Sequence, residues 1–150
     1  MKLEEALQTT KFKNQRHKAG LHILYTAWLL RTIVNKELRE FKLTHEQYNI
    51  LRILNGKHPE KMCVKDIAGR MIEKSSNVPR IIDRLESKKL IIRKASEKDG
   101  RQTMISLTPD GIDLLSASTK KVNGLHGSKM GLTEEEATLL NELLEKMHTE

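Results

Sequence analysis

Two short apolar stripes follow each other in the middle of the chain, and their spacing constrains the fold more than any other feature. The first stripe lies between Val64 and Met71, and the second lies between Val78 and Leu85. In the second stripe the apolar residues recur at i, i+3, i+4 and i+7, which places them on one face of an α-helix. Two short helices joined by a tight connection predict a helix-turn-helix.

A β-hairpin is predicted directly after these two helices. Leu90–Arg93 and Met104–Leu107 are short β-prone runs, and the polar segment between them contains the turn signal Asp99-Gly100. A hairpin in this position is the wing of a winged helix-turn-helix, which we place at about residues 44–107.

The segments on either side of this unit are predicted to be helical. A long helix at about residues 10–41 carries apolar residues on two faces, which indicates burial on two sides, as at a subunit interface. The expected fold is therefore mainly α, a single domain over residues 1–150 with a small β-hairpin wing. The helices at about 10–41 and 109–148 are expected to form a dimerisation region.

Helix-start signals support this division of the chain. Thr44 with Gln47, and Thr133 with Glu136, are capping-box patterns, and Pro109 suits the first turn of a helix. The helix after Thr133 is expected to bury its apolar stripe, which consists of Ala137, Leu140, Leu144 and Met147.

The charge is distributed unevenly along the chain. Residues 57–103 carry 13 Lys and Arg against 7 Asp and Glu, whereas residues 104–150 carry 4 against 8. A basic region attracts nucleic acid or an anionic membrane, and charge does not choose between them. The predicted winged-helix topology makes double-stranded DNA the expected partner.

Several classes of protein are disfavoured. The longest apolar stretch, Ile23–Leu30, is too short to cross a bilayer, and no secretory signal pattern is present, so we expect a cytoplasmic protein without membrane contact. Neither a nucleophile–base pair, a phosphate-binding glycine loop nor converging carboxylates are found, so neither an enzyme nor a cofactor is expected. The six histidines are scattered without metal-ligand spacing, so no metal site is predicted.

The second helix of the helix-turn-helix presents its polar face to DNA. Pro79 lacks an N–H and fits only the first turn, which places the helix start near Ser75 or Ser76. Arg80 can donate two hydrogen bonds to guanine, and Ser76 can reach a base edge or a phosphate. The alternative is a solvated face without a partner. The expected DNA-binding residues are Ser75, Ser76, Asn77, Arg80, Asp83 and Arg84.

The tip of the predicted wing carries Asp99 and Arg101. An arginine on a narrow wing can enter the minor groove, and the neighbouring carboxylate is expected to hold the tip through an ion pair. The alternative is an ordinary turn aspartate beside an exposed arginine. The expected phosphate contacts come from nearby lysines: Lys65, Lys74, Lys94 and Lys98.

The chain resembles the multiple-antibiotic-resistance regulator (MarR) family. The resemblance rests on Ser75–Glu86, on Asp99-Gly100-Arg101 and on the following Leu107-Thr108. It implies a winged-helix homodimer, usually a repressor, whose first and last helices interleave between subunits. Two positions depart from the family pattern. Pro79 replaces a hydrogen-bond donor, and Lys89 replaces a glycine after the recognition helix, which puts the turn there in question.

The family resemblance also implies a small aromatic or phenolic effector between the dimerisation helices and the DNA-binding lobe. Ordinary core packing is the alternative for the side chains that we expect to line that crevice, namely His22, Tyr25, Trp28, Phe41 and Tyr48. The single cysteine, Cys63, excludes an internal disulfide. It is either a reactive thiol at a helix start, between Lys61 and Lys65, or a structural cysteine in a short strand.

The sequence thus predicts a DNA-binding transcriptional regulator that binds an inverted-repeat operator as a homodimer. The family resemblance implies that it is a repressor and that a small-molecule effector releases it. The alternative is a winged-helix protein–protein interaction module that does not bind specific DNA sequences.

Overall fold

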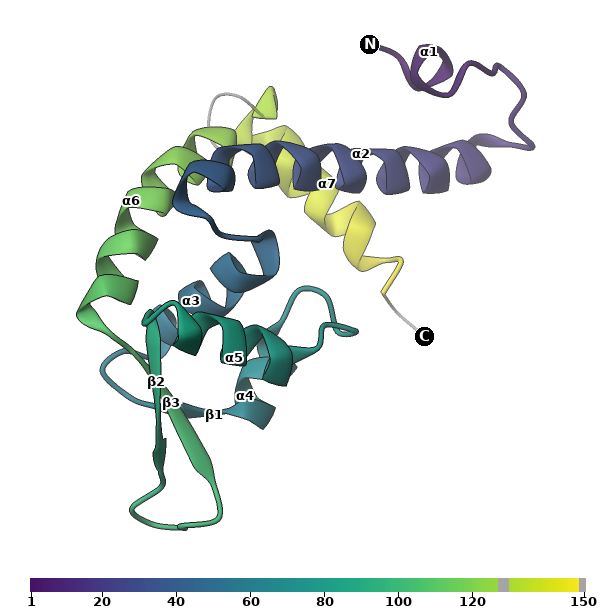
Figure 1. The fold of residues 1–150 in the computed structure, drawn as a ribbon. Helices are drawn as coiled ribbons and strands as arrows, with labels where there is room; N and C mark the ends of the chain where they lie inside the picture. The colour runs from purple at the N-terminus through teal and green to yellow at the C-terminus, as the bar shows by residue number, and fades with distance from the viewer. Residues whose placement is uncertain (127–129, 149–150) are drawn as a thin grey trace.

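The structure of the chain is a computed structural model that describes residues 1–126 and 130–148. It is mainly α-helical with one small antiparallel sheet, as the sequence predicts (Figure 1). In chain order the elements are α1 (Leu3–Leu7), α2 (Gln15–Leu38), the 3-10 helix η1 (Arg39–Phe41), α3 (His45–Lys57), β1 (Met62–Cys63), α4 (Val64–Arg70), α5 (Val78–Ser87), β2 (Ile91–Ala95), β3 (Thr103–Leu107), α6 (Pro109–His126) and α7 (Glu134–Glu145). Of the helices in these described ranges, none is long and apolar enough to cross a membrane.

Helix boundaries follow the capping residues. The hydroxyl of Thr44 accepts a hydrogen bond from the backbone N–H of Gln47 at the start of α3, and the matching capping box of Thr133 and Glu136 opens α7. Both capping boxes were predicted. The predicted helix at about residues 10–41 is shorter, because Asn14 caps α2 and the last turn tightens into η1. Part of the predicted 109–148 region, residues 127–129, lies outside the described residues.

The sheet has three strands, where the sequence predicts two. β2 and β3 form the wing, with Ile91 opposite Leu107 and Ala95 opposite Thr103. β1 adds to the other edge of β3 and gives the order β1-β3-β2. A two-residue strand is too short to show alternation, and the sequence offers it only as one interpretation of Cys63. That side chain is buried and makes no capping bond to α4.

The hydrophobic core joins α3, α4, α5 and the sheet. Its fully buried members come from every one of these elements: Ile50, Leu51, Ile67, Ile82, Leu85, Ile91 and Ile105. The C-terminal end of α2 enters the core through Leu38, and α6 enters it through Leu115 and Val122. We call α3 to β3, residues 45–107, the winged-helix lobe.

The turn between α5 and β2 keeps a left-handed residue although it lacks the family glycine. Lys89 has φ +60°, a conformation that is unfavourable for a residue with a side chain. The carbonyl group of Lys89 accepts a hydrogen bond from the Thr108 hydroxyl at 2.7 Å. The start of α6 also packs tightly here, since a Cβ at Gly111 would lie 2.1 Å from the carbonyl oxygen of Leu90. The turn therefore keeps its left-handed backbone conformation with a lysine at position 89 in place of the family glycine.

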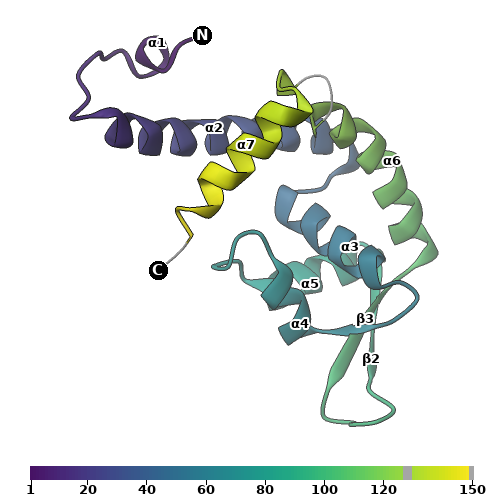
Figure 2. The same ribbon diagram turned by 180° about the vertical axis from the view of Figure 1, so that it is seen from behind.

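The helices α2 and α7 expose apolar residues in the single chain. α2 runs along the side of the molecule opposite the wing tip, and α1 lies beyond its free end (Figures 1 and 2). Trp28 on α2 is 58% exposed, Leu140 on α7 is 43% exposed, and Met147, which lies just after the end of α7, is 62% exposed. The prediction that the last helix buries Leu140 and Met147 is therefore wrong for one chain, because no described element of that chain covers them.

Candidate nucleic-acid interface

The helix α5 divides into an inner and an outer face as the sequence predicts. Ile82 and Leu85 are completely buried, whereas Arg80 and Arg84 are exposed. This separation leaves both guanidinium groups free to meet a ligand in front of the helix.

The helix begins two residues later than predicted. Asn77, not a serine, is the N-cap, and its side-chain oxygen accepts a hydrogen bond from the backbone N–H of Arg80 at 3.3 Å. Pro79 then occupies the second helical position, where its missing N–H costs no helical hydrogen bond. Ser75 and Ser76 lie in the preceding turn. The Ser76 hydroxyl is buried and has no hydrogen-bond partner among the described residues.

Asp83 is engaged within the chain. Its carboxylate forms an ion pair with Arg93 on β2, and Arg93 also lies 3.4 Å from a carboxylate oxygen of Glu86. This contact attaches α5 to the base of the wing. Asp83 therefore fixes the position of the wing strand relative to α5, a role that the sequence analysis did not identify.

The wing tip is held by backbone hydrogen bonds. Oδ1 of Asp99 accepts a hydrogen bond from the backbone N–H of Arg101 at 3.1 Å, and Oγ of Ser96 accepts one from the N–H of Asp99 at 3.2 Å. The N–H of Ser96 donates to the carbonyl oxygen of Gln102 at 2.8 Å and closes the loop. Among the ion pairs of the described residues, none joins Asp99 to Arg101, so the predicted ion pair is wrong. Arg101 remains exposed.

The predicted phosphate-binding lysines are spread over the lobe. Lys65 on α4, Lys94 on β2 and Lys98 at the wing tip are exposed. Lys74 lies in the turn before α5, where its ammonium group donates to the carbonyl oxygen of Gly69 at 2.6 Å. These lysines surround α5 and the wing without forming one compact cluster.

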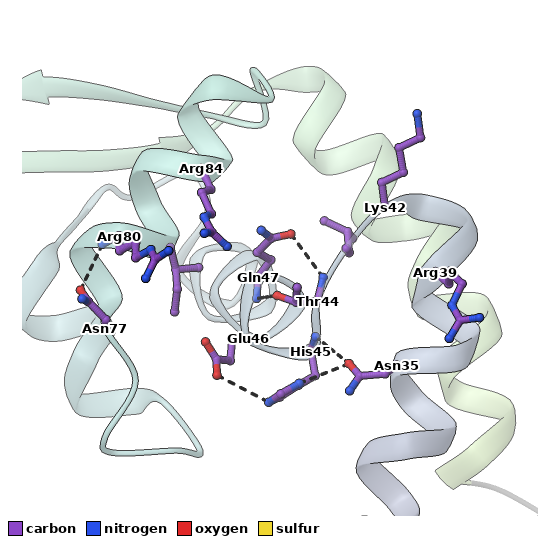
Figure 3. A pocket seen from close by; sticks show the side chains of 12 residues that line it. Asn35, Arg39, Lys42, Thr44, His45, Glu46, Gln47, Asn77, Arg80 and Arg84 are labelled. Carbon is purple, nitrogen blue, oxygen red and sulfur yellow. Dashed lines mark hydrogen bonds and ion pairs between the residues drawn. The ribbon is translucent and has the colours of Figure 1, made fainter.

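A basic hollow lies beside α5, and sequence reasoning missed two of its four arginine and lysine residues. Arg80 and Arg84 line it from α5, and Arg39 and Lys42 line it from the connection between α2 and α3 (Figure 3). Its volume is about 660 Å³. Lys88 lies close by, donating to Oε1 of Gln47 at 2.9 Å, and burial lowers the pKa of its ammonium group, as do the charges of Arg84 and Lys42. The sequence signal that could have predicted this part of the hollow is the pair of basic residues Arg39 and Lys42, which lie close together in the chain.

A second cavity, of about 720 Å³, lies between α2 and α6 on one side and the winged-helix lobe on the other. Of the five residues predicted to line such a crevice, only Tyr48 does so, and its hydroxyl lies 3.0 Å from that of Thr119. His22 and Tyr25 lie further toward the start of α2, Trp28 is exposed to solvent, and Phe41 packs against the core, so none of these four lines this cavity of the single chain. The apolar walls come instead from other residues: Ala27, Leu30, Val34, Met71, Ile72 and Val122.

Three possible metal ligands meet at the edge of both cavities. The side chains of His45, Glu46 and Glu73 each place one ligand atom within 4.8 Å of the others. The sequence analysis predicted no metal site, because Glu73 is far from the other two along the chain. Only the packing of the turn before α5 against the start of α3 brings them together.

Comparison with known proteins identifies the family. The sequence profile described as transcriptional regulator SarA/Rot matches residues 32–117, which is more than half of the chain. The chain belongs to the SarA/Rot family of transcriptional regulators. The matched range of this SarA/Rot regulator extends from the second half of α2, through the entire winged-helix lobe, into α6.

Similar proteins support the same assignment. The organic hydroperoxide resistance transcriptional regulator of Bacillus subtilis is 31% identical over 112 residues, which cover 75% of this chain and 72% of that protein. The crystal structure of a MarR transcription factor from Planctomyces limnophilus is 30% identical, with a TM-score of 0.68 over 92% of this chain and 98% of the other. The S. aureus MepR–DNA complex gives 26% identity and a TM-score of 0.76, covering 85% and 92%. The predicted resemblance to MarR regulators is confirmed, and this SarA/Rot chain is a regulator rather than an enzyme.

Proposed function

We propose that this regulator binds double-stranded DNA with α5 in the major groove and the wing tip in the minor groove. The observation that carries the proposal is the pair of exposed arginines, Arg80 and Arg84, on a helix that Asp83 and Arg93 attach to the wing. Because that ion pair fixes the two elements relative to each other, both can be presented to one stretch of duplex. The likeness to MepR, whose structure was determined as a DNA complex, supports this docking.

Each candidate residue receives a role from its position. Arg80 lies in the first turn of α5, where a recognition helix contacts base edges, so it is assigned to guanine. Ser75 and Asn77 precede and cap the helix and lie where phosphate oxygens approach a helix N-terminus, whereas Ser76 is assigned no phosphate contact because its hydroxyl is buried. Arg84 and the lysines at positions 65, 74, 94 and 98 are assigned to the phosphate backbone.

The DNA-binding form is proposed to be a homodimer. The exposed apolar residues of α2 and α7 are covered by no other part of the chain that the structure describes, and a second copy would bury them symmetrically. A two-fold dimer pairs with an inverted-repeat operator whose half-sites lie about one helical turn, roughly 10 bp, apart. If such an operator overlaps a promoter, the bound dimer represses transcription. The location proposed for this function is the cytoplasm.

A small aromatic or phenolic effector is proposed to bind the 720 Å³ cavity. Its walls are mainly apolar, and the hydroxyl of Tyr48 and the side chains of Asn49 and Arg52 provide polar groups. Since Ile72 and Glu73 of the turn before α5 also line it, a bound molecule would alter the start of the recognition helix.

Selection of bound sequences from random duplexes, followed by affinity measurements, tests this function. The wild-type protein is expected to select an inverted repeat. Arg80→Ala should weaken binding to it by about 1–3 kcal/mol and leave binding to random DNA almost unchanged. Arg16→Ala, an exposed arginine at the start of α2, is the matched control and should alter neither. A protein that shows no salt-dependent DNA binding would instead be a protein–protein interaction module.

A further inference from the structure

We propose that His45, Glu46 and Glu73 form a binding site for a divalent transition-metal ion of the Zn²⁺ class. Nε2 of His45 lies 3.9 Å from Oε1 of Glu46 and 3.6 Å from Oε2 of Glu73. The three side chains come from two separate segments, the first turn of α3 and the turn before α5. Figure 3 shows the carboxylate of Glu46 turned toward the imidazole of His45.

The imidazole of His45 is oriented for this task by Asn35 on α2. Oδ1 of Asn35 accepts a hydrogen bond from the backbone N–H of His45 at 3.2 Å, and it lies 3.2 Å from Nδ1 of the same residue. Because an amide oxygen only accepts hydrogen bonds, Nδ1 carries the hydrogen. In the neutral ring, Nε2 therefore presents a lone pair to the two carboxylates.

Among the described residues, the positive group that pairs with this cluster is Arg31, which contacts the other carboxylate oxygen of Glu73 and none of the three ligand atoms. Nε2 of His45 is a buried atom with no hydrogen-bond partner among the described residues. It faces oxygens that are themselves acceptors when ionised, so three electron-rich atoms lie together. A cation between them would remove the repulsion and satisfy all three.

The carboxylate of Glu73 is supported in the same way. Its Oε1 forms an ion pair with Arg31 on α2, which leaves Oε2 directed at the cluster. Metal sites in proteins orient their ligands through such outer contacts, with a histidine held at its second nitrogen and a carboxylate held by a donor. Asn35 and Arg31 are therefore assigned as positioning residues.

The donor set selects the kind of ion. One imidazole nitrogen and two carboxylate oxygens suit Zn²⁺ and its first-row neighbours, whereas Ca²⁺ and Mg²⁺ prefer oxygen alone. Metal–ligand distances of about 2.0–2.2 Å in a tetrahedral site require donors about 3.3 Å apart. The separations of 3.6 and 3.9 Å from Nε2 are close to this value, and side-chain rotation would also have to bring together the two carboxylate oxygens, since the three ligand atoms lie within 4.8 Å of one another. Water from the adjoining cavities supplies the fourth ligand.

An ion at this position would connect the effector cavity to the recognition helix. Glu73 lies four residues before Asn77, the N-cap of α5, and His45 and Glu46 line both cavities. Binding would attach the turn before α5 to α3, where the backbone N–H of Ile72 already donates to Asn49 at 3.1 Å. This regulatory part rests on the proposed DNA-binding function.

The site is tested in the absence of DNA by calorimetric titration with Zn²⁺ and by the absorption spectrum of bound Co²⁺. The wild-type protein should bind one ion per subunit and give the Co²⁺ spectrum of a four-coordinate N/O site. His45→Gln and Glu73→Gln should each weaken binding at least about tenfold, and Asn35→Ala should weaken it by about 10–100-fold. His22→Gln and Glu60→Gln, exposed residues outside the cluster, are matched controls and should bind as the wild type does.

Equal Zn²⁺ binding by the wild type and His45→Gln, each with a wild-type circular dichroism spectrum, would overturn the site. Failure of the wild type to bind Zn²⁺ would overturn it as well. The regulatory part is measured separately, as a change of at least about fivefold in operator affinity when Zn²⁺ is added, lost in Glu73→Gln. Metal binding without that change would overturn only the regulatory part, and absence of operator binding at any metal concentration would overturn the proposed function instead.

Discussion

In the winged-helix lobe most large apolar side chains are covered, with Ile72 and Ile92 as exposed exceptions, whereas along α2 and α7 several of them face solvent. Ile82 and Leu85 on α5 are completely buried, but Trp28 on α2 is 58% exposed and Leu139 on α7 is 56% exposed. The lobe therefore forms most of the core, which Leu38 of α2 and Leu115 and Val122 of α6 complete, while α2 and α7 have apolar surface that no described element of the chain covers. Since patches of this kind mark interaction sites, the difference separates a region whose apolar side chains are covered within the chain from a region that we propose is completed by association.

The largest expected effect concerns the flanking helices. The double variant Leu140→Glu, Leu143→Glu places charges on the exposed apolar face of α7. Burial of one leucine contributes about 1.5–3 kcal/mol, and a two-fold dimer loses four, so the dimer dissociation constant should rise at least about 1000-fold. Analytical ultracentrifugation measures the change. Thr138→Glu, on the polar face of α7, is the control, and equal dissociation by both variants would contradict the proposed interface.

Substitutions in the core of the winged-helix lobe should instead lower the free energy of unfolding. Ile82→Ala removes a completely buried side chain, and the free energy of unfolding should fall by about 2–5 kcal/mol. Ile72→Ala makes the same chemical change at a residue that is 84% exposed and should alter stability by less than about 0.5 kcal/mol. Denaturant unfolding measures both. Similar losses for the two variants would mean that the turn before α5 is covered in solution.

The wing tests the charged surface of the lobe. Arg101→Ala should weaken operator binding at least about tenfold, or roughly 1.4 kcal/mol. It should also reduce the slope of log affinity against log salt by about 2 per dimer. Arg101→Lys retains the charge and should keep the slope. Asp99→Ala removes the hydrogen bond to the backbone N–H of Arg101, so its smaller effect should nearly vanish when Arg101 is already alanine. Additive losses would show that Asp99 has a separate role.

The smallest effect is expected in the turn at Lys89, where the lobe keeps an unfavourable backbone conformation. Lys89→Gly removes a left-handed strain of about 1–2 kcal/mol but adds about 0.5–1 kcal/mol of unfolded-state entropy. The protein should become more stable by about 0.5 kcal/mol, measured by thermal unfolding. Lys89→Ala removes the same side chain without freeing φ and should give no gain. A gain in Lys89→Ala would show that the long side chain, not the backbone, is unfavourable.

Local patterns were sufficient to predict the order of the longer helices and of the two wing strands, but not α1. The capping boxes at Thr44 and Thr133, the stripe of α5 and the turn at Asp99 each depend on residues within a few positions, and all were found. The start of α5 was misplaced by two residues because Ser75, Ser76 and Asn77 are all good caps in sequence. The structure selects Asn77, whose side chain reaches the N–H of Arg80.

The sequence by itself determined the winged-helix architecture, because helix periodicity, capping and turn chemistry are short-range properties of the chain. Tertiary structure alone decided which distant residues meet. It placed Tyr48 in the cavity and the other predicted aromatic residues elsewhere, paired Asp83 with Arg93, and brought Glu73 to His45 and Glu46. Each of these contacts depends on the angle and depth at which two elements pack. That geometry arises from the whole core, from Leu38 to Val122, and no local pattern encodes it.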